Sequence, residues 1–313
     1  MSEAEKSDGR FRGRMDFVSS IVKADDEKRL LYTLIEPDPR RYDLIELSDG
    51  PYYRDKFLHV AISKREMHEN MVAQMPGLPM YHLAPNIESS RTYADERLEA
   101  VTREMETGEH TPPQQVAAKH QDFYERPDVR DVVFLSVDIC GGTSLRKAEP
   151  TKFDRAYQIF TRELGTVVGQ FNGSILKTTG DGFIAYIDFP GFTVQCDNAV
   201  DMGLTLLLVL RDSVNPSLAA AGLPELSIRV GADFGASTIR TVHIPATGYS
   251  SPEVASDAIN RAVKIQESCE NNEFRIGRSL YELVHVQWLM RAREAPFDGS
   301  LVGIPGYPAY RVT

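Results

Sequence analysis

The sequence predicts an α/β (α+β) protein in which a smaller mixed N-terminal region precedes a domain with the ferredoxin-like order β-α-β-β-α-β. The chain has 313 residues, which is about twice the usual length of one domain. A polar stretch that contains three prolines, residues 108–131, separates two halves of different pattern. In the second half, short apolar runs alternate with segments of helical periodicity, as expected for strands and covering helices.

The N-terminal half contains predicted strands and helices but no motif that carries chemistry. The segments RLLYTLIE and YDLIEL read as short strands around the turn Pro37-Asp38-Pro39. Residues 57–75 are predicted to form a helix, and the charged residues 89–109 a solvated helix or connector. We expect residues 1–125 to form a region of unknown role, regulatory or dimerising, and residues 126–313 to form the second domain.

The second half supplies the core elements in order. VVFLSVD is a buried-strand run, and the helix after it is predicted from apolar residues at helical spacing: Phe153, Tyr157, Phe160, Leu164, Val167 and Phe171. SILKT and FIAYI form a hairpin, because Gly180 and Gly182 permit a tight turn around Asp181. A helix at residues 197–214 and a strand at residues 226–234 complete the order, and further elements follow.

Charge and hydropathy exclude several classes of protein. Thirty-five basic and 45 acidic side chains give a net charge of −10, which argues against a protein that coats nucleic acid. The longest strongly apolar run, residues 206–210, is far shorter than the ~20 residues of a membrane span, and the polar start lacks the core of a signal peptide. Three scattered cysteines support neither a disulfide framework nor a zinc site. We therefore expect a cytoplasmic protein without a membrane partner.

Two aspartates are predicted to meet at one edge of the sheet. Asp138 ends the first strand and Asp181 occupies the hairpin tip, so both carboxylates reach the same edge. Mg²⁺ and Mn²⁺ prefer oxygen ligands and commonly bind one or two carboxylates together with substrate phosphates. The turn Gly141, Gly142 and Thr143 at the start of a helix presents backbone N–H groups to an anion. The alternative is an unremarkable aspartate at a strand end and another in a turn.

Four segments resemble the motifs of the class III nucleotidyl cyclases and occur in the family's order. The family's F-x-D-I-x-G-F-T appears as LSVDICGGT, residues 135–143, and its K-x-x-G-D-G-x-x-A appears as KTTGDGFIA, residues 177–185. The strand I-R-I-G-x-x-x-G appears as IRVGADFG, residues 228–235, and G-D-x-V-N-x-A-x-R appears as SDAINRAVK, residues 256–264. The resemblance covers roughly residues 130–313.

The resemblance implies a role for each matched residue. Asp138 and Asp181, with the main-chain carbonyl of Ile139, would hold two Mn²⁺ or Mg²⁺ ions that bind the triphosphate and activate the 3′ hydroxyl. Arg229 matches the family's phosphate-binding arginine, and a guanidinium fork suits bidentate phosphate contact. Asn260 matches the asparagine that positions the ribose. The family also implies a homodimer, in which the metal aspartates of one chain face the base-reading residues of the other.

Other matched positions depart from the family. Lys264 stands where the family has a transition-state arginine, and its near neighbour Arg261 is the alternative for that role. The lysine and aspartate that read the purine base correspond to Lys177 and to a longer acid, Glu253. A plain alternative is that Asn260, Arg261 and Lys264 form only the polar face of a core helix.

The phosphate end of the site is altered as well. Gly142 replaces a phenylalanine, and Val302 replaces a phosphate-contacting lysine. Altered base and phosphate positions and a non-cyclase leader are features of bacterial pyrimidine cyclases of the antiphage signalling systems known as Pycsar, which the chain resembles.

The leading hypothesis is an enzyme that converts a pyrimidine nucleoside triphosphate, UTP before CTP, into its 3′,5′-cyclic monophosphate and pyrophosphate. Cyclic UMP or cyclic CMP would then act on a downstream effector in antiviral defence. One alternative is an adenylate or guanylate cyclase, and another is an inactive nucleotide-binding regulatory module. A diguanylate cyclase or polymerase palm shares the core order, but no GGDEF-like hairpin occurs. The seven histidines are scattered without ligand spacing.

Overall fold

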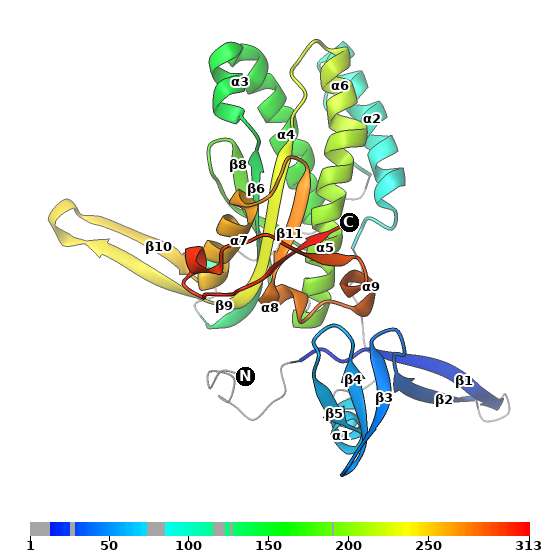
Figure 1. The fold of residues 1–313 in the computed structure, drawn as a ribbon. Helices are drawn as coiled ribbons and strands as arrows, with labels where there is room; N and C mark the ends of the chain where they lie inside the picture. Colours follow the sequence, from blue (N-terminus) through cyan, green and yellow to red (C-terminus); the bar gives the residue numbers. More distant parts are fainter. Residues whose placement is uncertain (1–12, 26–28, 74–84, 115–122, 126–127, 190) are drawn as a thin grey trace. The chain divides into compact units, whose positions relative to one another are not determined.

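The computed structural model describes residues 13–25, 29–73, 85–114, 123–125, 128–189 and 191–313. The chain divides into two compact units, whose elements are labelled in Figure 1. The first unit consists of Met1–Tyr81 and Glu282–Met290, and the second of His82–Tyr281 and Arg291–Thr313.

The first unit is built from short antiparallel strands around a small core. Its elements are β1 (Phe17–Asp25), β2 (Leu30–Pro37), β3 (Tyr42–Leu47), β4 (Gly50–Asp55), β5 (Ala61–Ser63), α1 (Lys64–Ala73) and α9 (Val286–Leu289). β1 pairs with β2, and β3, β4 and β5 form a second sheet. The buried guanidinium of Arg41 binds Asp16 at 2.9 Å and Asp55 at 2.7 Å, so its charge is compensated inside the unit.

The second unit contains one large sheet and the helices that cover it. The strands are β6 (Arg130–Ile139), β7 (Ser174–Thr178), β8 (Gly182–Ile187), β9 (Ile228–Ile244), β10 (Tyr249–Ala255), β11 (Glu273–Gly277), β12 (Ala292–Ala295) and β13 (Ala309–Val312). Their order is β12-β13-β11-β9-β6-β8-β7, and β10 pairs with the outer part of β9. The four central strands β9-β6-β8-β7 are antiparallel neighbours, which confirms the predicted ferredoxin-like core.

The helices of this unit pack on the sheet or on one another. They are α2 (Ser90–Thr107), α3 (Gly142–Ala148), α4 (Pro150–Gln170), α5 (Phe192–Val209), α6 (Asn215–Ala220), α7 (Asp257–Glu267) and α8 (Arg278–Tyr281), with the π-helical turn η3 (Leu210–Val214) and the 3₁₀ turns η2 (Phe123–Glu125), η4 (Pro245–Thr247) and η5 (Gly299–Val302). Val132 and Phe134 pack with Ala258 and Ala262 of α7. Alternate residues of a strand face opposite sides of the sheet, and Val132 and Phe134 are such residues, so α7 packs on one face of it. Helix α5 also contacts β6, β9 and β11, and α4 contacts α5 and β7.

Two glycines allow close approaches within this core. A Cβ on Gly182 would lie 2.0 Å from the carbonyl oxygen of Val137, and one on Gly231 would lie 2.3 Å from the backbone nitrogen of Gln266. Glycine at these positions therefore lets β8 pair tightly with β6 and lets α7 lie directly on β9. Both glycines belong to the motif segments of the sequence analysis, and their role in this structure is to permit close packing.

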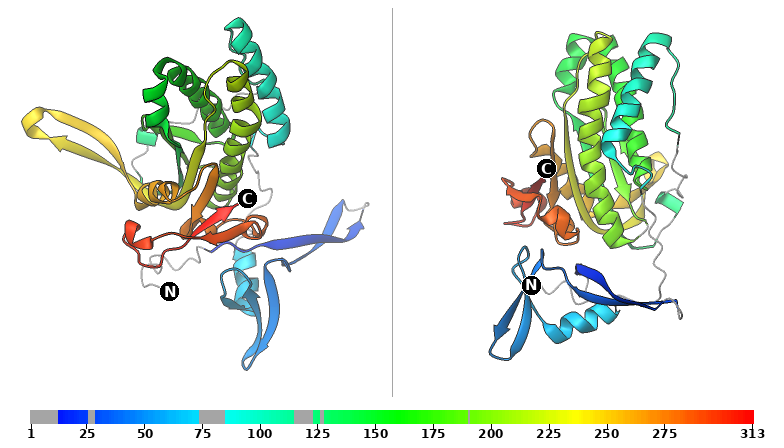
Figure 2. Two further views of the ribbon diagram at one scale, coloured as in Figure 1. Left: turned by 45° about the horizontal axis from the view of Figure 1, so that its top comes forward. Right: turned by 90° about the vertical axis from the view of Figure 1, so that its right-hand side faces the viewer.

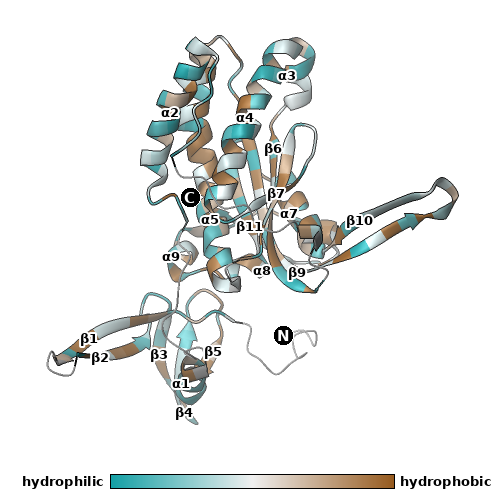
Figure 3. Ribbon diagram, turned by 180° about the vertical axis from the view of Figure 1, so that it is seen from behind, coloured by the Kyte–Doolittle hydropathy of each residue, from teal (hydrophilic) through white to brown (hydrophobic). Residues whose placement is uncertain are grey.

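One helical stretch is long and apolar enough to cross a membrane by length and composition. It is Thr193–Ala220, and 61% of its apolar window is buried inside the structure. The stretch comprises most of α5, then η3 and α6, and Figure 2 shows it beside α2 and α4. Hydropathy colouring places its hydrophobic residues among those of the neighbouring elements (Figure 3). A buried core helix explains its composition.

Several element boundaries differ from the sequence predictions. Of the helix predicted at residues 57–75, the described part is Lys64–Ala73, because a turn and β5 come first and residues 74–75 lie outside the described residues. The strand predicted to end at Phe234 continues to Ile244 and forms an arm with β10 that projects from the sheet (Figure 1). The helix predicted at residues 197–214 begins at Phe192.

The two compact units divide between Tyr81 and His82, whereas the sequence suggested a boundary after residue 125. The helix α2 belongs to the second unit, because Tyr93, Ala94 and Val101 are buried and α2 contacts α5 and α6. The segment predicted as a solvated helix or connector is thus a helix, and one of its sides is buried. Conversely, Glu282–Met290 belongs to the first unit, although it lies far along the sequence.

A buried ion-pair network joins α2 to α4. Glu104, whose side chain is 3% exposed, binds Arg162 through contacts of 2.5 and 2.9 Å and Arg155 at 3.2 Å. Burial alone would raise the pKa of Glu104, but the hydrogen bonds and charges of Arg162 and His110 lower it below its ordinary value. The folded state therefore favours the ionised carboxylate.

Replacing Glu104 with glutamine is expected to lower the free energy of unfolding by roughly 2–3 kcal/mol at pH 7, because it leaves guanidinium groups without their carboxylate. A lowered folded-state pKa stabilises the protein above about pH 4.5, and the contribution is lost as the pH falls through the folded-state value. The difference between wild type and Glu104→Gln should thus shrink in acid. Chemical denaturation across pH measures it, and the exposed Glu149→Gln should change stability by less than ~0.5 kcal/mol.

Candidate active site

The two predicted metal-binding aspartates lie at one end of the central strands. Asp138 is near the end of β6 and is directly paired with Gly182, the residue after Asp181. The backbone N–H of Ile139 donates to the carbonyl oxygen of Asp181 at 3.1 Å, which fixes the hairpin turn against β6. The structure therefore brings Asp138, Ile139 and Asp181 together.

Arg229 completes this group from the neighbouring strand. It is paired with Asp138 in the β6–β9 register, and its Nη2 donates to Oδ2 of Asp138 at 2.5 Å. The side chains of Arg229 and Asp138 are 29% and 21% exposed. Burial raises the pKa of Asp138, the nearby negative charge and hydrogen bond of Asp181 raise it further, and Arg229 opposes the rise. Two carboxylates and one guanidinium thus interact in a partly buried site.

The glycine turn after Asp138 lies against the second aspartate. Gly141, which directly precedes α3 as its N-cap residue, has a φ of +67° and has no side chain to cap the helix. A Cβ on Gly142 would lie 2.9 Å from Oδ2 of Asp181. Gly142 therefore leaves room for that carboxylate, which gives a local reason for the departure from the family's phenylalanine. Thr143 is exposed in the first turn of α3.

Three of the predicted site residues lie on α7, two at the surface and one in the core. Asn260 is exposed, and Nζ of Lys264 binds Glu267 at 2.9 Å on the surface. Arg261 instead points into the core, where its Nε binds Asp233 and its Nη2 donates to the carbonyl of Phe234 at 2.9 Å. Arg261 is therefore not suited to replace the transition-state arginine, and Lys264 is the remaining candidate.

The predicted base-reading residues lie on different strands. Lys177 is exposed on β7. Glu253 lies on β10, directly opposite Arg240 of β9, with 3.8 Å between its Oε2 and Nη2 of Arg240. Arg240 is eleven positions beyond Arg229 on β9, which at ~3.3 Å per residue corresponds to roughly 36 Å along the strand. Glu253 is thus far from the carboxylate site of its own chain.

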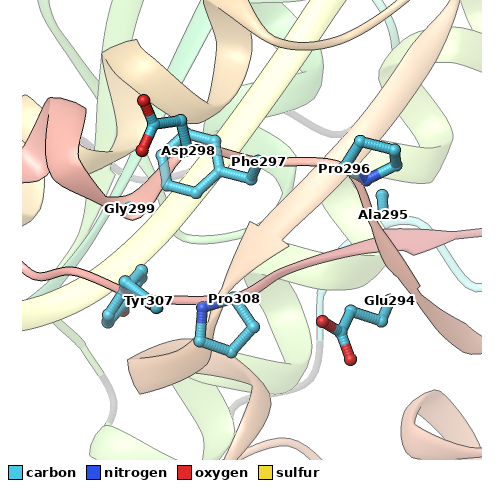
Figure 4. Close-up of a pocket in the computed structure, with 9 residues that line it drawn as sticks. Glu294, Ala295, Pro296, Phe297, Asp298, Gly299, Tyr307 and Pro308 are labelled. Atoms are coloured by element: carbon cyan, nitrogen blue, oxygen red, sulfur yellow. The ribbon is translucent and has the colours of Figure 1, made fainter.

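Two surface hollows lie outside the carboxylate group. One, of about 510 Å³, is lined by segments 294–299 and 306–308, and Figure 4 shows Tyr307 and Pro308 facing Phe297 and Asp298 across it. Another, of about 440 Å³, lies at the base of the β9–β10 arm and is lined by Arg240, Val254 and Asp257, among others. The second hollow adjoins Glu253.

A cluster with metal-ligand chemistry occurs elsewhere in the second unit. Glu104, His110 and Glu163 have potential ligand atoms within 4.8 Å of one another. Glu163 is paired with Arg97 at 2.7 Å, and Glu104 with Arg155 and Arg162. The guanidinium groups already compensate both carboxylates, so the cluster is better explained as an ion-pair network than as a metal site.

The sequence analysis did not identify two basic residues that contact parts of the predicted site: Arg146 beside the hairpin turn and Arg240 beside Glu253. Nη2 of Arg146 donates to the carbonyl of Gly180 at 3.0 Å and thereby connects α3 to the hairpin turn. Arg240 was missed because its strand was predicted to end at Phe234, and only the observed register places it opposite Glu253. Arg146 could have been found from the sequence, because it lies four residues after Gly142, on the short helix that follows the glycine turn.

Comparison with solved structures gives the class to which this fold corresponds. A crystal structure of a guanylyl cyclase covers 59% of this chain and 93% of its own, with a TM-score of 0.50 and 20% sequence identity. A crystal structure of an adenylyl cyclase from P. aeruginosa covers 59% of this chain and 95% of its own, with a TM-score of 0.50 and 19% identity. The second unit has the fold of class III nucleotidyl cyclase catalytic domains, which confirms the fold expected from the four motifs.

A curated relative is similar in sequence. A uridylate cyclase from Micromonospora echinofusca is 25% identical over 161 residues, which are 50% of this chain and 51% of the relative. The match thus spans about half the length of each protein. No protein-family model matches the chain.

Proposed function

We propose that the protein is a class III nucleotidyl cyclase that converts a pyrimidine nucleoside triphosphate, UTP before CTP, into the 3′,5′-cyclic monophosphate and pyrophosphate. The observation that carries the proposal is the grouping of Asp138, Asp181 and Arg229 beside a glycine turn on the fold of cyclase catalytic domains. Similarity to a uridylate cyclase supports the choice of substrate.

The carboxylate pair is chemically suited to Mg²⁺ or Mn²⁺. Burial raises the pKa of Asp138, and the charge of the neighbouring Asp181 raises it further, so a cation at this site would stabilise the ionised carboxylate; the missing side chain of Gly142 leaves space beside Asp181. These residues, with the carbonyl of Ile139, would hold two ions. Bound cations would neutralise phosphate charge and lower the pKa of the ribose 3′ hydroxyl.

The chain's own groups would hold and orient the substrate. Arg229 can release Asp138 and bind phosphate oxygens through its guanidinium fork, while backbone N–H groups after Gly141 approach the phosphates. The 3′ oxygen would then bond to the α-phosphorus as the bond from that phosphorus to the pyrophosphate oxygen breaks, and the hydroxyl proton would pass to solvent water at this partly exposed site. Asn260 would orient the ribose, and Lys264 would stabilise the charge that develops at the phosphorus.

Base recognition would require a second copy of the chain. Glu253 lies opposite Arg240, roughly 36 Å along β9 from Arg229, so one chain does not supply both ends of a nucleotide site. A symmetric homodimer supplies two composite sites, each with Asp138 and Arg229 from one protomer and Lys177 and Glu253 from its partner.

A pyrimidine is the base that this pair would read. The carboxylate of Glu253 extends one methylene further than an aspartate and leaves less room for two fused rings. It can accept from the amino group of cytosine or the ring N–H of uracil, while Lys177 donates to a base carbonyl. The geometry of this pair does not by itself separate UTP from CTP, and the uridylate cyclase similarity favours UTP.

The substrate is tested by incubating purified protein with UTP, CTP, ATP or GTP under identical Mn²⁺ and measuring kcat/KM for each. UTP should give the highest value, and Glu253→Asp should raise the values for the purines relative to UTP by enlarging the base site. The exposed Glu225→Asp is the matched control and should leave the ranking unchanged. A preference for ATP or GTP of about tenfold, or ~1.4 kcal/mol, would make a purine cyclase the better assignment.

The cellular role belongs to the same proposal. A cytoplasmic pyrimidine cyclase would act in antiphage defence by producing a messenger for a cyclic-nucleotide-sensing effector. An inactive nucleotide-binding module is the second candidate, and the intact set of Asp138, Asp181, Arg229 and Asn260 favours the enzyme.

A further inference from the structure

We propose that Asp233, Arg261 and Tyr307 form a buried positioning network that sets the placement of helix α7, and with it Asn260 and Lys264, for turnover. The inference rests on the proposed function for its kinetic consequence. The structural part, that the network holds α7, can be measured without any enzymatic activity.

The carboxylate of Asp233 is the centre of the network. It is fully buried on β9, and its Oδ2 accepts from Nε of Arg261 and from the hydroxyl of Tyr307 at 2.7 Å. Its Oδ1 accepts from the backbone N–H of Leu280 at 3.2 Å and of Phe234 at 2.9 Å. One carboxylate thus connects β9, α7, α8 and the segment before β13.

The surrounding backbone leaves no spare room for this carboxylate. A Cβ on Gly277 would lie 2.6 Å from Cγ of Asp233, and one on Gly235 would lie 3.0 Å from Nη2 of Arg261. Burial raises the pKa of Asp233, and the charge of Arg261 and the hydrogen bond from Tyr307 oppose that rise. The charged carboxylate therefore depends on both partners, and removing either leaves a costly buried group.

The position of Arg261 on α7 gives the network its functional consequence. Arg261 directly follows Asn260 and precedes Lys264 by three residues, so these side chains emerge from adjacent turns of one short helix. The C-terminal end of α7 contacts the carboxylate site of the same chain: Nη1 of Arg229 donates to the carbonyl of Glu267 at 3.5 Å. In the proposed homodimer, Asn260 and Lys264 face the phosphate held by the partner's carboxylate site, so a shift of α7 would move both side chains relative to that phosphate.

Tyr307 is the most suitable residue to test, because Tyr307→Phe removes one hydroxyl and keeps the buried ring. Ser279→Ala is the matched control, because Oγ of Ser279 lies 3.0 Å from the same hydroxyl but is not bonded to Asp233. We expect Tyr307→Phe to lower kcat about tenfold with KM changed less than about twofold, since small misplacements of transition-state groups act on kcat. Ser279→Ala should keep kcat within about twofold of wild type.

Two further measurements separate positioning from general destabilisation. In a Lys264→Ala, Asn260→Ala background, Tyr307→Phe should lower kcat by less than about twofold, because the groups it positions are gone. Amide hydrogen exchange over residues 257–267 should be faster in Tyr307→Phe than in Ser279→Ala.

The results distinguish this inference from the proposed function. If wild type forms no cyclic nucleotide, the proposed function fails, and unchanged exchange in α7 would independently overturn the network. If wild type is active, equal losses of kcat in both backgrounds, or no loss in Tyr307→Phe, would show that the network does not act through Asn260 and Lys264.

Discussion

Replacing Asp138 or Asp181 with alanine is expected to lower turnover at least about a thousandfold, or ~4 kcal/mol of transition-state stabilisation. Each substitution removes one of the carboxylates that would hold the metal ions, and neither side chain is part of the apolar core. Product formation with Mn²⁺ and the labelled substrate measures the effect. Both variants should keep a wild-type circular dichroism spectrum and unfolding temperature within a few degrees.

The matched control is Asp95→Ala, which removes an exposed carboxylate from α2. It should retain full activity. Nucleotide binding should persist in Asp138→Ala, because the substitution frees Arg229 from its 2.5 Å contact and leaves it available to phosphate. Full turnover in either metal-site variant would end the two-metal interpretation.

Mixing two inactive variants is expected to restore activity. An Asp138→Ala chain lacks a metal ligand, and an Asn260→Ala chain lacks the ribose contact from the other side of a composite site. In a mixed dimer one of the two sites is wild type, so complete subunit exchange at equal concentrations should give about one quarter of wild-type activity. The measurement is turnover after exchange, with the mixed dimer verified by two affinity tags.

A further mixture controls for incidental recovery. Asp138→Ala combined with Asp181→Ala places both lesions on the same side of the site, so every composite site contains one damaged carboxylate pair. That mixture should stay inactive. Verified mixed dimers that remain inactive in the Asp138 and Asn260 pairing would contradict the shared-site arrangement.

The core of the fold could be predicted because its signals are local. Alternating apolar runs and a glycine hairpin indicated β6, α4, β7, β8 and α5 close to where the structure has them. The β9–β10 arm could not be predicted, because its exposed and half-buried residues lack the apolar run that marks a buried strand. The assignment of α2 to the second unit depends on tertiary burial of Tyr93 and Val101, which composition does not reveal.

The site was predictable where strand ends and turns fix position. Asp138 and Asp181 are close to each other because their strands are direct neighbours, as the topology implied. Arg261 was considered as an alternative to Lys264, and its sequence spacing on α7 does not show that its side chain binds the buried Asp233. The pairing of Arg240 with Glu253 depends on a register between strands, which the sequence alone does not specify.

The most direct test of the central claim is to identify the product formed from UTP by purified protein with Mn²⁺. The account predicts 3′,5′-cyclic UMP and one pyrophosphate for each molecule formed, resolved by chromatography and mass spectrometry against the 2′,3′ isomer. UDP with inorganic phosphate would instead show hydrolysis. Bound but unchanged nucleotide, with all four triphosphates, would contradict the cyclase assignment and favour a regulatory binding module.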